Sequence, residues 1–319
     1  MVYSVIGTGG VGGYFGGCLA RAGREVHFLL HKDYDFVRRH GLQVNSWKGD
    51  FHLDRVNAYD NSAAMPRSDV VIVALKSVNN PLLRELLPPL LKPGTLVLII
   101  ENGIGVEAQV QAMFPQALLA AGLAYAGSSK TRPGVIDHQD LGKLTVAPYT
   151  PGAALRAAEV VRDFVEAGIP ADSAEYLEAR WKKQVWNMPF NGMTVALNTS
   201  TAALIAHPAT AALIRAQMLE VIAAAQALGV KNIDESYADR MLETTAGMTP
   251  YAPSMKVDHD LGRPMEIGSI YTEALRQARE AGCPMLRLEM LEAELRFIEN
   301  QSSMPGNRPR PRIGNPHRA

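Results

Sequence analysis

The sequence has few cysteines, no long hydrophobic run and no excess of charge of either sign. Among its 319 residues, Cys18 and Cys283 are the only cysteines, and 32 Lys and Arg balance 32 Asp and Glu. Two distant cysteines in apolar helical contexts are typical of free thiols in a reducing cytosol rather than of a disulfide. The balanced charge gives no electrostatic reason to expect a nucleic acid or an anionic membrane as a partner.

Membrane and metal signals are also missing. The longest apolar runs, such as Val70 to Leu75 and Leu96 to Ile100, have the length of a β-strand and are far too short to cross a bilayer. No charged n-region precedes a cleavable apolar core, so we expect no signal peptide. The metal-binding patterns CxxC and HExxH do not occur, and Asp258-His259-Asp260 is more typical of a loop or helix start. We therefore expect a soluble cytoplasmic protein without a bound metal.

A glycine-rich turn stands between a strand and a helix at the start of the chain. The apolar run Val2 to Ile6 leads into Gly7-Thr8-Gly9-Gly10-Val11-Gly12, a helical pattern follows to Arg21, and a second apolar run spans Val26 to Leu30. This is the order that a dinucleotide-binding unit requires. Gly7 permits the tight turn, Gly9 lets the backbone approach a pyrophosphate, and Gly12 lets the helix pack closely on the sheet. The helix N-terminus adds unpaired N–H groups for phosphate, so we predict a bound dinucleotide.

The end of the second strand bears on the choice of nicotinamide cofactor. Enzymes that select NAD(H) usually carry Asp or Glu there, which accepts hydrogen bonds from the ribose 2′-hydroxyl. Here Leu30 or His31 occupies that position and Lys32 follows, and cations suit a 2′-phosphate. The pattern favours NADP(H). The plain alternative is that Lys32 is a solvated loop charge and that Asp33 caps the next helix.

The predicted secondary structure changes near residue 174. Up to there, short apolar runs alternate with helical patterns, which predicts a doubly wound α/β sheet. Beyond it only long helical patterns follow. We expect a Rossmann-like dinucleotide-binding domain at 1–174, a helical substrate domain at 175–301 and a flexible Arg- and Pro-rich tail at 302–319. The expected strands are 2–6, 26–30, 41–46, 50–53, 69–75, 95–100, 118–125, 134–138 and 143–147; the expected helices after the first are 81–91, 153–167, 175–197, 209–228, 234–246 and 265–300, the last with a break at 282–284.

One predicted helix carries a polar stripe within an apolar sequence. Lys183, Asn187 and Asn191 lie at i, i+4 and i+8, so they share one helix face. A polar stripe along a buried helix needs hydrogen-bond partners. The pattern alone leaves open whether the stripe packs against another domain or lines a polar pocket. Pro189 lies inside this helix, where it should kink the backbone.

Six motifs, taken in order, resemble those of the ketopantoate reductases (2-dehydropantoate 2-reductases), within the wider group of 6-phosphogluconate-dehydrogenase-like two-domain enzymes. The motifs are the glycine turn, Ala74-Leu75-Lys76-Ser77, Glu101-Asn102-Gly103-Ile104-Gly105, Trp181-x-Lys183-x-x-x-Asn187-x-x-x-Asn191, Pro253-Ser254-Met255-x-x-Asp258 and Met265-Glu266-Ile267. The resemblance runs from Val2 to about Ile298. It implies an α/β fold with an N-terminal Rossmann-like doubly wound sheet and an all-α, 6-phosphogluconate-dehydrogenase-like C-terminal domain. The implied reaction is NADPH-dependent reduction of ketopantoate to pantoate, a step of pantothenate and coenzyme A biosynthesis.

The resemblance also assigns roles to individual residues. Lys183 stands at the family's general-acid position, and Glu266 matches a carboxylate near the substrate hydroxyl and the cofactor. Hydride delivery to a ketone carbon leaves negative charge on its oxygen, which needs a proton or a fixed cation. The implied substrate-binding residues are Asn102, Asn187, Asn191 and Ser254. The implied cofactor contacts are Gly7, Thr8, Gly9, Gly10, Val11, Gly12, His31, Lys32, Lys76, Asn102, Ala126 and Glu266.

The chain departs from the family pattern mainly on the implied substrate side. His31 stands where the family often has Arg, Thr201 where it often has a substrate-binding Asn, and Lys256-Val257, Gly268-Ser269 and Tyr271-Thr272 replace other common pairs. A reductase for another branched or bulky 2-oxo acid therefore stays open. A β-hydroxyacid dehydrogenase is disfavoured because its glycine motif before the interdomain helix is missing. A non-catalytic NADP(H) sensor is disfavoured because the general-acid lysine and the carboxylate are both present. A monomer and a homodimer are both compatible with the sequence.

Overall fold

The computed structural model describes residues 1–248 and 252–303 of the chain. The chain divides into two compact units, residues 1–180 and 181–319. Of the tail expected at 302–319, all but the first two residues lie outside the described residues. Among the described residues, no helix combines the length and the apolar character that a membrane span requires.

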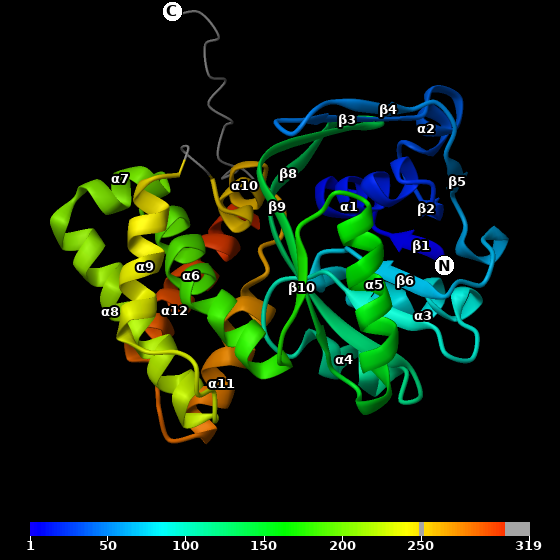
Figure 1. The fold of residues 1–319 in the computed structure, drawn as a ribbon. Helices are drawn as coiled ribbons and strands as arrows, with labels where there is room; N and C mark the ends of the chain where they lie inside the picture. Colours follow the sequence, from blue (N-terminus) through cyan, green and yellow to red (C-terminus); the bar gives the residue numbers. More distant parts are fainter. Residues whose placement is uncertain (249–251, 304–319) are drawn as a thin grey trace, which may run out of the picture. The chain divides into compact units, whose positions relative to one another are not determined.

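The first unit is built on one ten-stranded sheet (Figure 1). Its parallel part contains β1 (Val2–Ile6), β2 (Glu25–Leu29), β5 (Asn57–Tyr59), β6 (Val70–Val73), β7 (Leu96–Ile99) and β8 (Leu118–Arg132). These strands lie side by side in the order β8-β7-β6-β1-β2-β5. Beyond β8 the sheet is mixed and contains β9 (Val135–Pro148), β3 (Leu42–Ser46), β4 (Phe51–Leu53) and β10 (Ala171–Ser173).

Helices cover both faces of this sheet. On one face lie α1 (Gly10–Arg21), α2 (Tyr34–His40) and α5 (Ala154–Glu166), and their core includes Val5, Phe15 and Phe164. On the other face lie α3 (Leu83–Leu86) and α4 (Val106–Met113), whose core includes Val71 and Val110. Short 3₁₀ turns occur at η1 (Ser62–Ala64), η2 (Ser77–Leu82), η3 (Pro88–Leu90) and η4 (Pro151–Ala153). The doubly wound arrangement predicted from the alternating pattern is confirmed.

Two regions of the first unit differ in detail from the prediction. The helix expected at 81–91 is instead the succession of η2, α3 and η3, because Pro81, Pro88 and Pro89 lack the N–H that a continuous helix needs. The runs 118–125, 134–138 and 143–147 are parts of two long antiparallel strands, β8 and β9. The polar, exposed stretch between these runs hid their continuity. The short elements β5, β10 and α4 were not predicted, and a helix at α2 was implied only by the alternative in which Asp33 caps it.

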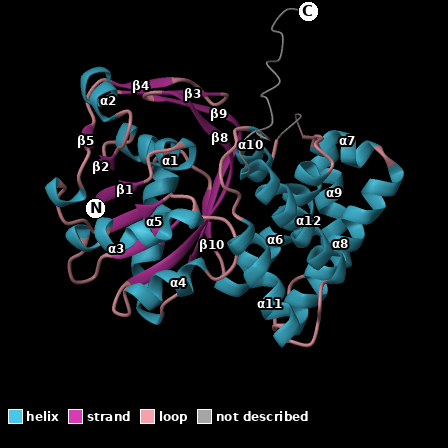
Figure 2. Ribbon diagram, turned by 180° about the vertical axis from the view of Figure 1, so that it is seen from behind, coloured by secondary structure: helices cyan, strands magenta, loops and turns pink. Residues whose placement is uncertain are grey.

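The second unit contains only helices in its described residues (Figure 2). They are α7 (Thr201–Ala206), α8 (Pro208–Ala227), α9 (Glu235–Ala246), α10 (Ser254–Asp260), the π-helical turn η5 (Gly268–Thr272), α11 (Glu273–Glu280) and α12 (Leu286–Ser303). The preceding helix, α6 (Tyr176–Ala196), begins in the first unit and continues into the second. It runs without interruption through Pro189. The predicted break after α11 is present, with Gly282 at φ 72°.

Candidate active site

Three neighbouring strands of the first unit carry predicted site residues beyond their carboxyl ends. The glycine turn Gly7–Gly12 follows β1, Lys76 follows β6, and Asn102 follows β7. Because β1 lies between β2 and β6, the strand order reverses at this place. Ligands of open α/β sheets bind beyond the carboxyl ends of the strands at such a reversal. The structure therefore brings these three predicted elements to one edge of the sheet.

The glycine turn is shaped by close backbone contacts. Gly7 has φ 94°, and the backbone that follows β6 is so close that a Cβ on Gly7 would lie 2.6 Å from the carbonyl oxygen of Ala74. A Cβ on Gly12 would lie 2.3 Å from the carbonyl oxygen of Gly7, whereas one on Gly9 would meet no atom within 4 Å. The first N–H groups of α1 have no intrahelical acceptor, as at any helix N-terminus. Open space beside Gly9 and these N–H groups fit a pyrophosphate.

Alanine at two of these glycines should separate packing from cofactor binding. Gly12→Ala forces a Cβ against backbone and should destabilise the free protein by about 1–3 kcal/mol, as overpacking does. Gly9→Ala adds its methyl in open space and should leave the melting temperature of the free protein unchanged, yet weaken dinucleotide binding. Thermal melts with and without NADPH measure both effects. Equal melting losses for the two variants would contradict this account of the turn.

The polar residues at the end of β2 differ in exposure and in their hydrogen bonds. His31 and Lys32 are exposed, whereas Asp33 is buried and its carboxylate accepts a hydrogen bond from Lys130 Nζ at 2.9 Å. Asp33 precedes α2 but makes no side-chain cap, so the alternative that it caps the helix is wrong. Thr8 donates its hydroxyl to the carbonyl oxygen of Leu29 at 2.9 Å, which holds the glycine turn against β2. With Asp33 engaged, the exposed side chains at the strand end are basic.

Strand β8 passes directly beside the glycine turn. Ser128 Oγ donates to the carbonyl oxygen of Gly10 at 2.9 Å, and a Cβ on Gly10 would lie 2.4 Å from the carbonyl oxygen of Ser128. The register between β8 and β9 shifts between Tyr125 and Ala126. Ala126, the predicted backbone contact of the cofactor, thus lies at a strand irregularity two residues from a contact with the turn.

A buried ionic network supports the segment that carries Asn102. Arg180 donates from its guanidinium to the carbonyl oxygen of Glu101 at 2.6 Å and to the carboxylate of Glu107. Tyr176 donates its hydroxyl to the same carboxylate at 2.8 Å. Burial, reinforced by the Glu107 carboxylate, raises the pKa of Tyr176 far above its usual range, so this phenol stays a proton donor.

The other side of the same segment is held by a buried amide. Asn80 Nδ2 donates to Glu101 Oε2 and to Gln109 Oε1, both at 3.0 Å. The backbone of Glu101 and its side chain are thus both fixed, one residue before Asn102. This network was not predicted from the sequence. Its only local signal was Glu107 beside apolar residues in the first turn of α4, since a charge buried there needs a partner.

In the second unit, α6 presents the predicted polar stripe. Lys183 is half-buried, and Asn187 and Asn191 are buried. Asn191 donates from Nδ2 to the carbonyl oxygen of Asn187 at 3.0 Å and accepts from the backbone N–H of Met255 at 3.0 Å. Asn187 Nδ2, by contrast, is buried without a hydrogen-bond partner among the described residues. An unused buried donor beside a lysine favours an acceptor-rich ligand such as a carboxylate.

Asn191 also joins α6 to α10. Its amide oxygen accepts from the second residue of α10, and the first residue of that helix is Ser254, which is half-buried. The N-cap residue of α10 is Pro253, which has no side-chain acceptor, so Asn191 supplies from α6 the oxygen that an N-cap side chain usually provides. Asn191 therefore positions Ser254, a role beyond the direct substrate contact that was predicted for it.

The segment after Glu266 is fastened to the same helix. Gln184 Nε2 donates to the carbonyl oxygen of Ile270 at 3.0 Å, and the Tyr271 hydroxyl donates to the carbonyl oxygen of Met188. Glu266 is 1% exposed and stands two residues before the π-helical turn η5. Single π turns inside helices are frequent at functional sites. The segments that carry Ser254 and Glu266 are thus both hydrogen-bonded to α6, which carries Lys183, Asn187 and Asn191.

One departure from the family pattern has a packing explanation. Tyr271 is fully buried, and a Cβ on Gly192 would lie 2.3 Å from its hydroxyl oxygen. Gly192 on α6 thus leaves the space that the tyrosine ring fills. Burial raises the pKa of this phenol well above its usual range, so it remains a donor to Met188. The buried Tyr271 thus holds η5 against α6.

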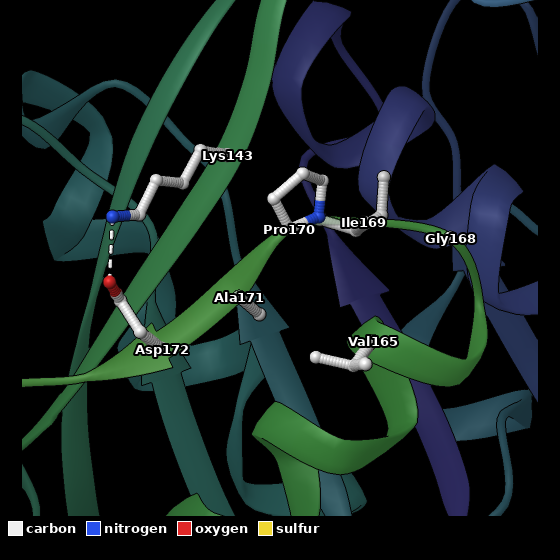
Figure 3. Close-up of a pocket in the computed structure, with 7 residues that line it drawn as sticks. All are labelled: Lys143, Val165, Gly168, Ile169, Pro170, Ala171 and Asp172. Carbon is white, nitrogen blue, oxygen red and sulfur yellow. Dashed lines mark ion pairs between the residues drawn. The ribbon is translucent and has the colours of Figure 1, made fainter.

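A surface hollow of about 480 Å³ lies elsewhere on the first unit (Figure 3). Val165, Gly168, Ile169, Pro170 and Ala171 line it, and the ion pair between Lys143 Nζ and Asp172 Oδ2, at 2.6 Å, borders it. None of the predicted site residues takes part. Among the described residues, no group of three or more His, Cys, Asp or Glu is placed to hold a metal ion.

Comparison with known proteins decides the family. Residues 3–151 match the family model described as ketopantoate reductase PanE/ApbA, and residues 175–299 match the model of its C terminal. The 2-dehydropantoate 2-reductase of a Nostoc species is 42% identical over 306 residues, which cover 94% of this chain and 96% of that protein. The chain belongs to the ketopantoate reductase family.

Solved structures agree with this membership. The crystal structure of 2-dehydropantoate 2-reductase from Geobacter metallireducens GS-15 is 36% identical and has a TM-score of 0.90, covering 93% of this chain and 99% of that one. The ternary structure of a D-mandelate dehydrogenase with NADH and anilino(oxo)acetate has a TM-score of 0.85 at 20% identity, covering 94% and 98% of the two chains. The latter shows the fold alone. The fold and the oxidoreductase class expected from the motifs are confirmed.

In this ketopantoate reductase the predicted residues form two groups, one in each unit. The first unit holds the glycine turn, His31, Lys32, Lys76, Asn102 and Ala126; the second holds Lys183, Asn187, Asn191, Ser254 and Glu266. The positioning roles of Gln184, Tyr271, Arg180 and Glu107 were not predicted from the sequence. Gln184 lies directly after Lys183, but nothing in the sequence indicates that its amide bonds a carbonyl 86 residues away.

Proposed function

We propose that this ketopantoate reductase reduces 2-dehydropantoate to pantoate with NADPH, and that Lys183 is the general acid. The observation that carries the proposal is the buried, unpartnered amide of Asn187 one helical turn from Lys183. A buried donor without a partner costs about 1–3 kcal/mol. An oxygen of a 2-oxo acid would remove that cost on binding, next to a cation able to donate a proton.

The residues of the second unit suit the chemistry of a ketone. Bound NADPH supplies the hydride that adds to the carbonyl carbon. Lys183 would give one proton to the carbonyl oxygen, which becomes the hydroxyl, and would regain a proton from solvent after the product leaves. Asn187 would orient the substrate through its free N–H, and Ser254 would add a hydroxyl contact. Buried Glu266 would accept a hydrogen bond from the new hydroxyl group.

The residues of the first unit suit the phosphate-rich cofactor. The N-terminus of α1 and the open side of Gly9 would hold the pyrophosphate, and Lys76 and Asn102 stand at the neighbouring strand ends. Directly after β2, the carboxylate of Asp33 is engaged by Lys130. An acceptor for a ribose 2′-hydroxyl is therefore replaced by exposed His31 and Lys32, which suit a 2′-phosphate.

Replacing Lys32 should test the choice of cofactor. Lys32→Ala is expected to raise the KM for NADPH about tenfold, the size of one exposed charge-assisted contact, with little change for NADH. Steady-state kinetics with both cofactors measure the difference. Lys231→Ala, an exposed lysine of the second unit, is the matched control. Equal effects on the two cofactors would rule out the 2′-phosphate contact.

The substrate is tested by the oxidation of NADPH with ketopantoate beside a panel of branched and aromatic 2-oxo acids. A strong preference for ketopantoate in kcat/KM supports the proposal. Turnover of another acid would retain the mechanism but replace the substrate, an alternative that the departures at Thr201 and Gly268-Ser269 keep open. NADPH binding without any turnover would favour a cofactor sensor. The proposed location is the cytoplasm, where the reduced cofactor is available.

A further inference from the structure

The outer half of the β8–β9 hairpin runs from the glycine turn to the end of β2. Near the glycine turn, Ser128 donates to the carbonyl oxygen of Gly10 at 2.9 Å. Two residues further along β8, Lys130 Nζ lies 2.9 Å from Oδ2 of Asp33, in the short segment between β2 and α2. In a dinucleotide-binding unit the ribose of the adenosine lies beyond the end of this strand. The ammonium of Lys130 therefore lies beside the place at which NADPH and NADH differ.

Asp33 is the one acidic residue between β2 and α2. Its side chain is 6% exposed, and its carboxylate accepts a second hydrogen bond, at 3.5 Å, from the backbone N–H of Gly134 in the hairpin turn. A carboxylate in this segment favours NADH, because it accepts hydrogen bonds from the ribose 2′-hydroxyl. It also repels the 2′-phosphate of NADPH. The charge of Asp33 alone would therefore oppose the phosphate contact that is proposed above for Lys32.

Lys130 offsets this negative charge from the neighbouring hairpin. Because the carboxylate of Asp33 is almost fully buried, salt and water screen the ion pair only weakly. The lysine side chain is 33% exposed, so its ammonium borders both the carboxylate and solvent. One of its three N–H groups is directed at Asp33, which leaves two that can be donated to an oxygen of a phosphate. The pair together thus offers a phosphate a donor instead of a repelling charge.

The backbone around the pair holds Lys130 in place. Lys130 pairs with Ile136 of β9 in the antiparallel ladder, close to the turn of the hairpin. That turn lies against α2, since a Cβ on Gly134, which has φ 67°, would lie 2.9 Å from the ring of Phe36. The lysine stem is flexible, but the strand that carries it is fixed at both the glycine turn and α2. The hairpin therefore positions a cation at a site that β2 and α2 form.

We propose that Lys130 determines the preference for NADPH over NADH, by cancelling the charge of Asp33 and by placing a second cation beside the 2′-phosphate. The inference rests on the proposed function in its choice of cofactor. It adds a residue that lies 97 positions from Asp33 in the sequence. Lys32 acts on the phosphate alone, whereas Lys130 acts also through Asp33. Loss of Lys130 leaves an unpaired carboxylate near the ribose 2′-hydroxyl, which favours NADH.

Binding titrations with NADPH and with NADH, followed by nicotinamide fluorescence, test the proposal without turnover of any 2-oxo acid. We expect Lys130→Met to raise the Kd for NADPH about 30–100-fold without raising the Kd for NADH. The matched control is Lys92→Met, because Lys92 forms a similar ion pair with Asp69, at 2.7 Å, before β6 and β7 at the amino-terminal edge of the same sheet. This control should change neither Kd. Melting curves establish that each variant is folded.

Asp33→Asn distinguishes this role from that of a structural tether. Asparagine keeps the shape of the side chain and an acceptor for Lys130, but it removes the negative charge. Asp33→Asn should therefore lower the Kd for NADPH, the opposite of the effect of Lys130→Met, and the double variant should return to within about tenfold of the wild type. If the ion pair only fastens the hairpin to α2, both single variants weaken NADPH and NADH alike. That result would overturn the proposal.

The wild-type titration separates this inference from the proposed function. A wild-type protein that binds NADPH no more tightly than NADH would overturn the proposed choice of cofactor, and the role of Lys130 with it. A wild-type protein that prefers NADPH, together with equal effects of Lys130→Met on the two cofactors, would overturn the role of Lys130 alone.

Discussion

Replacing Lys183 by alanine should lower kcat for ketopantoate reduction by about 10²–10³-fold while leaving the affinity for NADPH nearly unchanged. Lys183 is on the polar face of α6, half-buried, one turn before the unpartnered amide of Asn187. Lys183 is proposed to donate its proton in the transition state, when negative charge develops on the substrate oxygen. Its loss should therefore appear in kcat and in kcat/KM together, rather than in KM alone.

The neighbouring lysine provides the control for this variant. Lys182 lies one residue away on another face of α6, with its ammonium 5.9 Å from the ring centre of Tyr237. Lys182→Ala changes the same helix by the same number of atoms and removes the same charge. Stopped-flow and steady-state rates for the two variants, together with NADPH binding measured by fluorescence, distinguish the roles. Full activity of Lys183→Ala, or an equal loss for Lys182→Ala, would remove the assignment of the general acid.

A feature could be predicted from the sequence when it depends on residues that are close together in the chain, and could not when it depends on distant ones. The glycine turn was predictable because its glycines are required by close local contacts. A Cβ on Gly12, for example, would lie 2.3 Å from the carbonyl oxygen of Gly7. The stripe of Lys183, Asn187 and Asn191 was predictable because helix periodicity alone aligns it. The second role of Asn191 was not, since it depends on Met255, 64 residues away. Periodicity specifies which residues share a face, but not what that face meets.

In two places the hydrophobic pattern predicted the wrong secondary structure: the proline-rich stretch at 81–91 and the long strands β8 and β9. Apolar spacing at 81–91 predicted one helix, yet three prolines divide it into short turns. The outer half of the β8–β9 hairpin is polar and exposed, so hydrophobic alternation did not reveal it, although backbone pairing continues to Arg132. In both places the backbone's hydrogen-bonding capacity decided the structure. Side-chain hydropathy, on which the prediction was based, had less effect on the secondary structure than backbone hydrogen bonding.

The most destabilising change outside the proposed catalytic residues should be the loss of Arg180. Its guanidinium is buried, and it holds both the carbonyl oxygen of Glu101 and the carboxylate of Glu107, which is fully buried as well. Arg180→Met leaves the Glu107 carboxylate without its cation. Removal of one member of a buried ion pair costs about 3–5 kcal/mol. Urea unfolding should show a loss of this size.

Removing the opposite charge as well separates stability from positioning. In the double variant Arg180→Met with Glu107→Leu, the Glu107 carboxylate is no longer buried without its cation, so part of the lost stability should return. The carbonyl oxygen of Glu101 still lacks its donor at 2.6 Å, and the neighbouring Asn102 is therefore less well fixed. We expect the double variant to unfold at a higher urea midpoint than Arg180→Met while its kcat/KM for ketopantoate stays low. A double variant that regains both stability and activity would show that Arg180 balances Glu107 and has no part in holding Asn102.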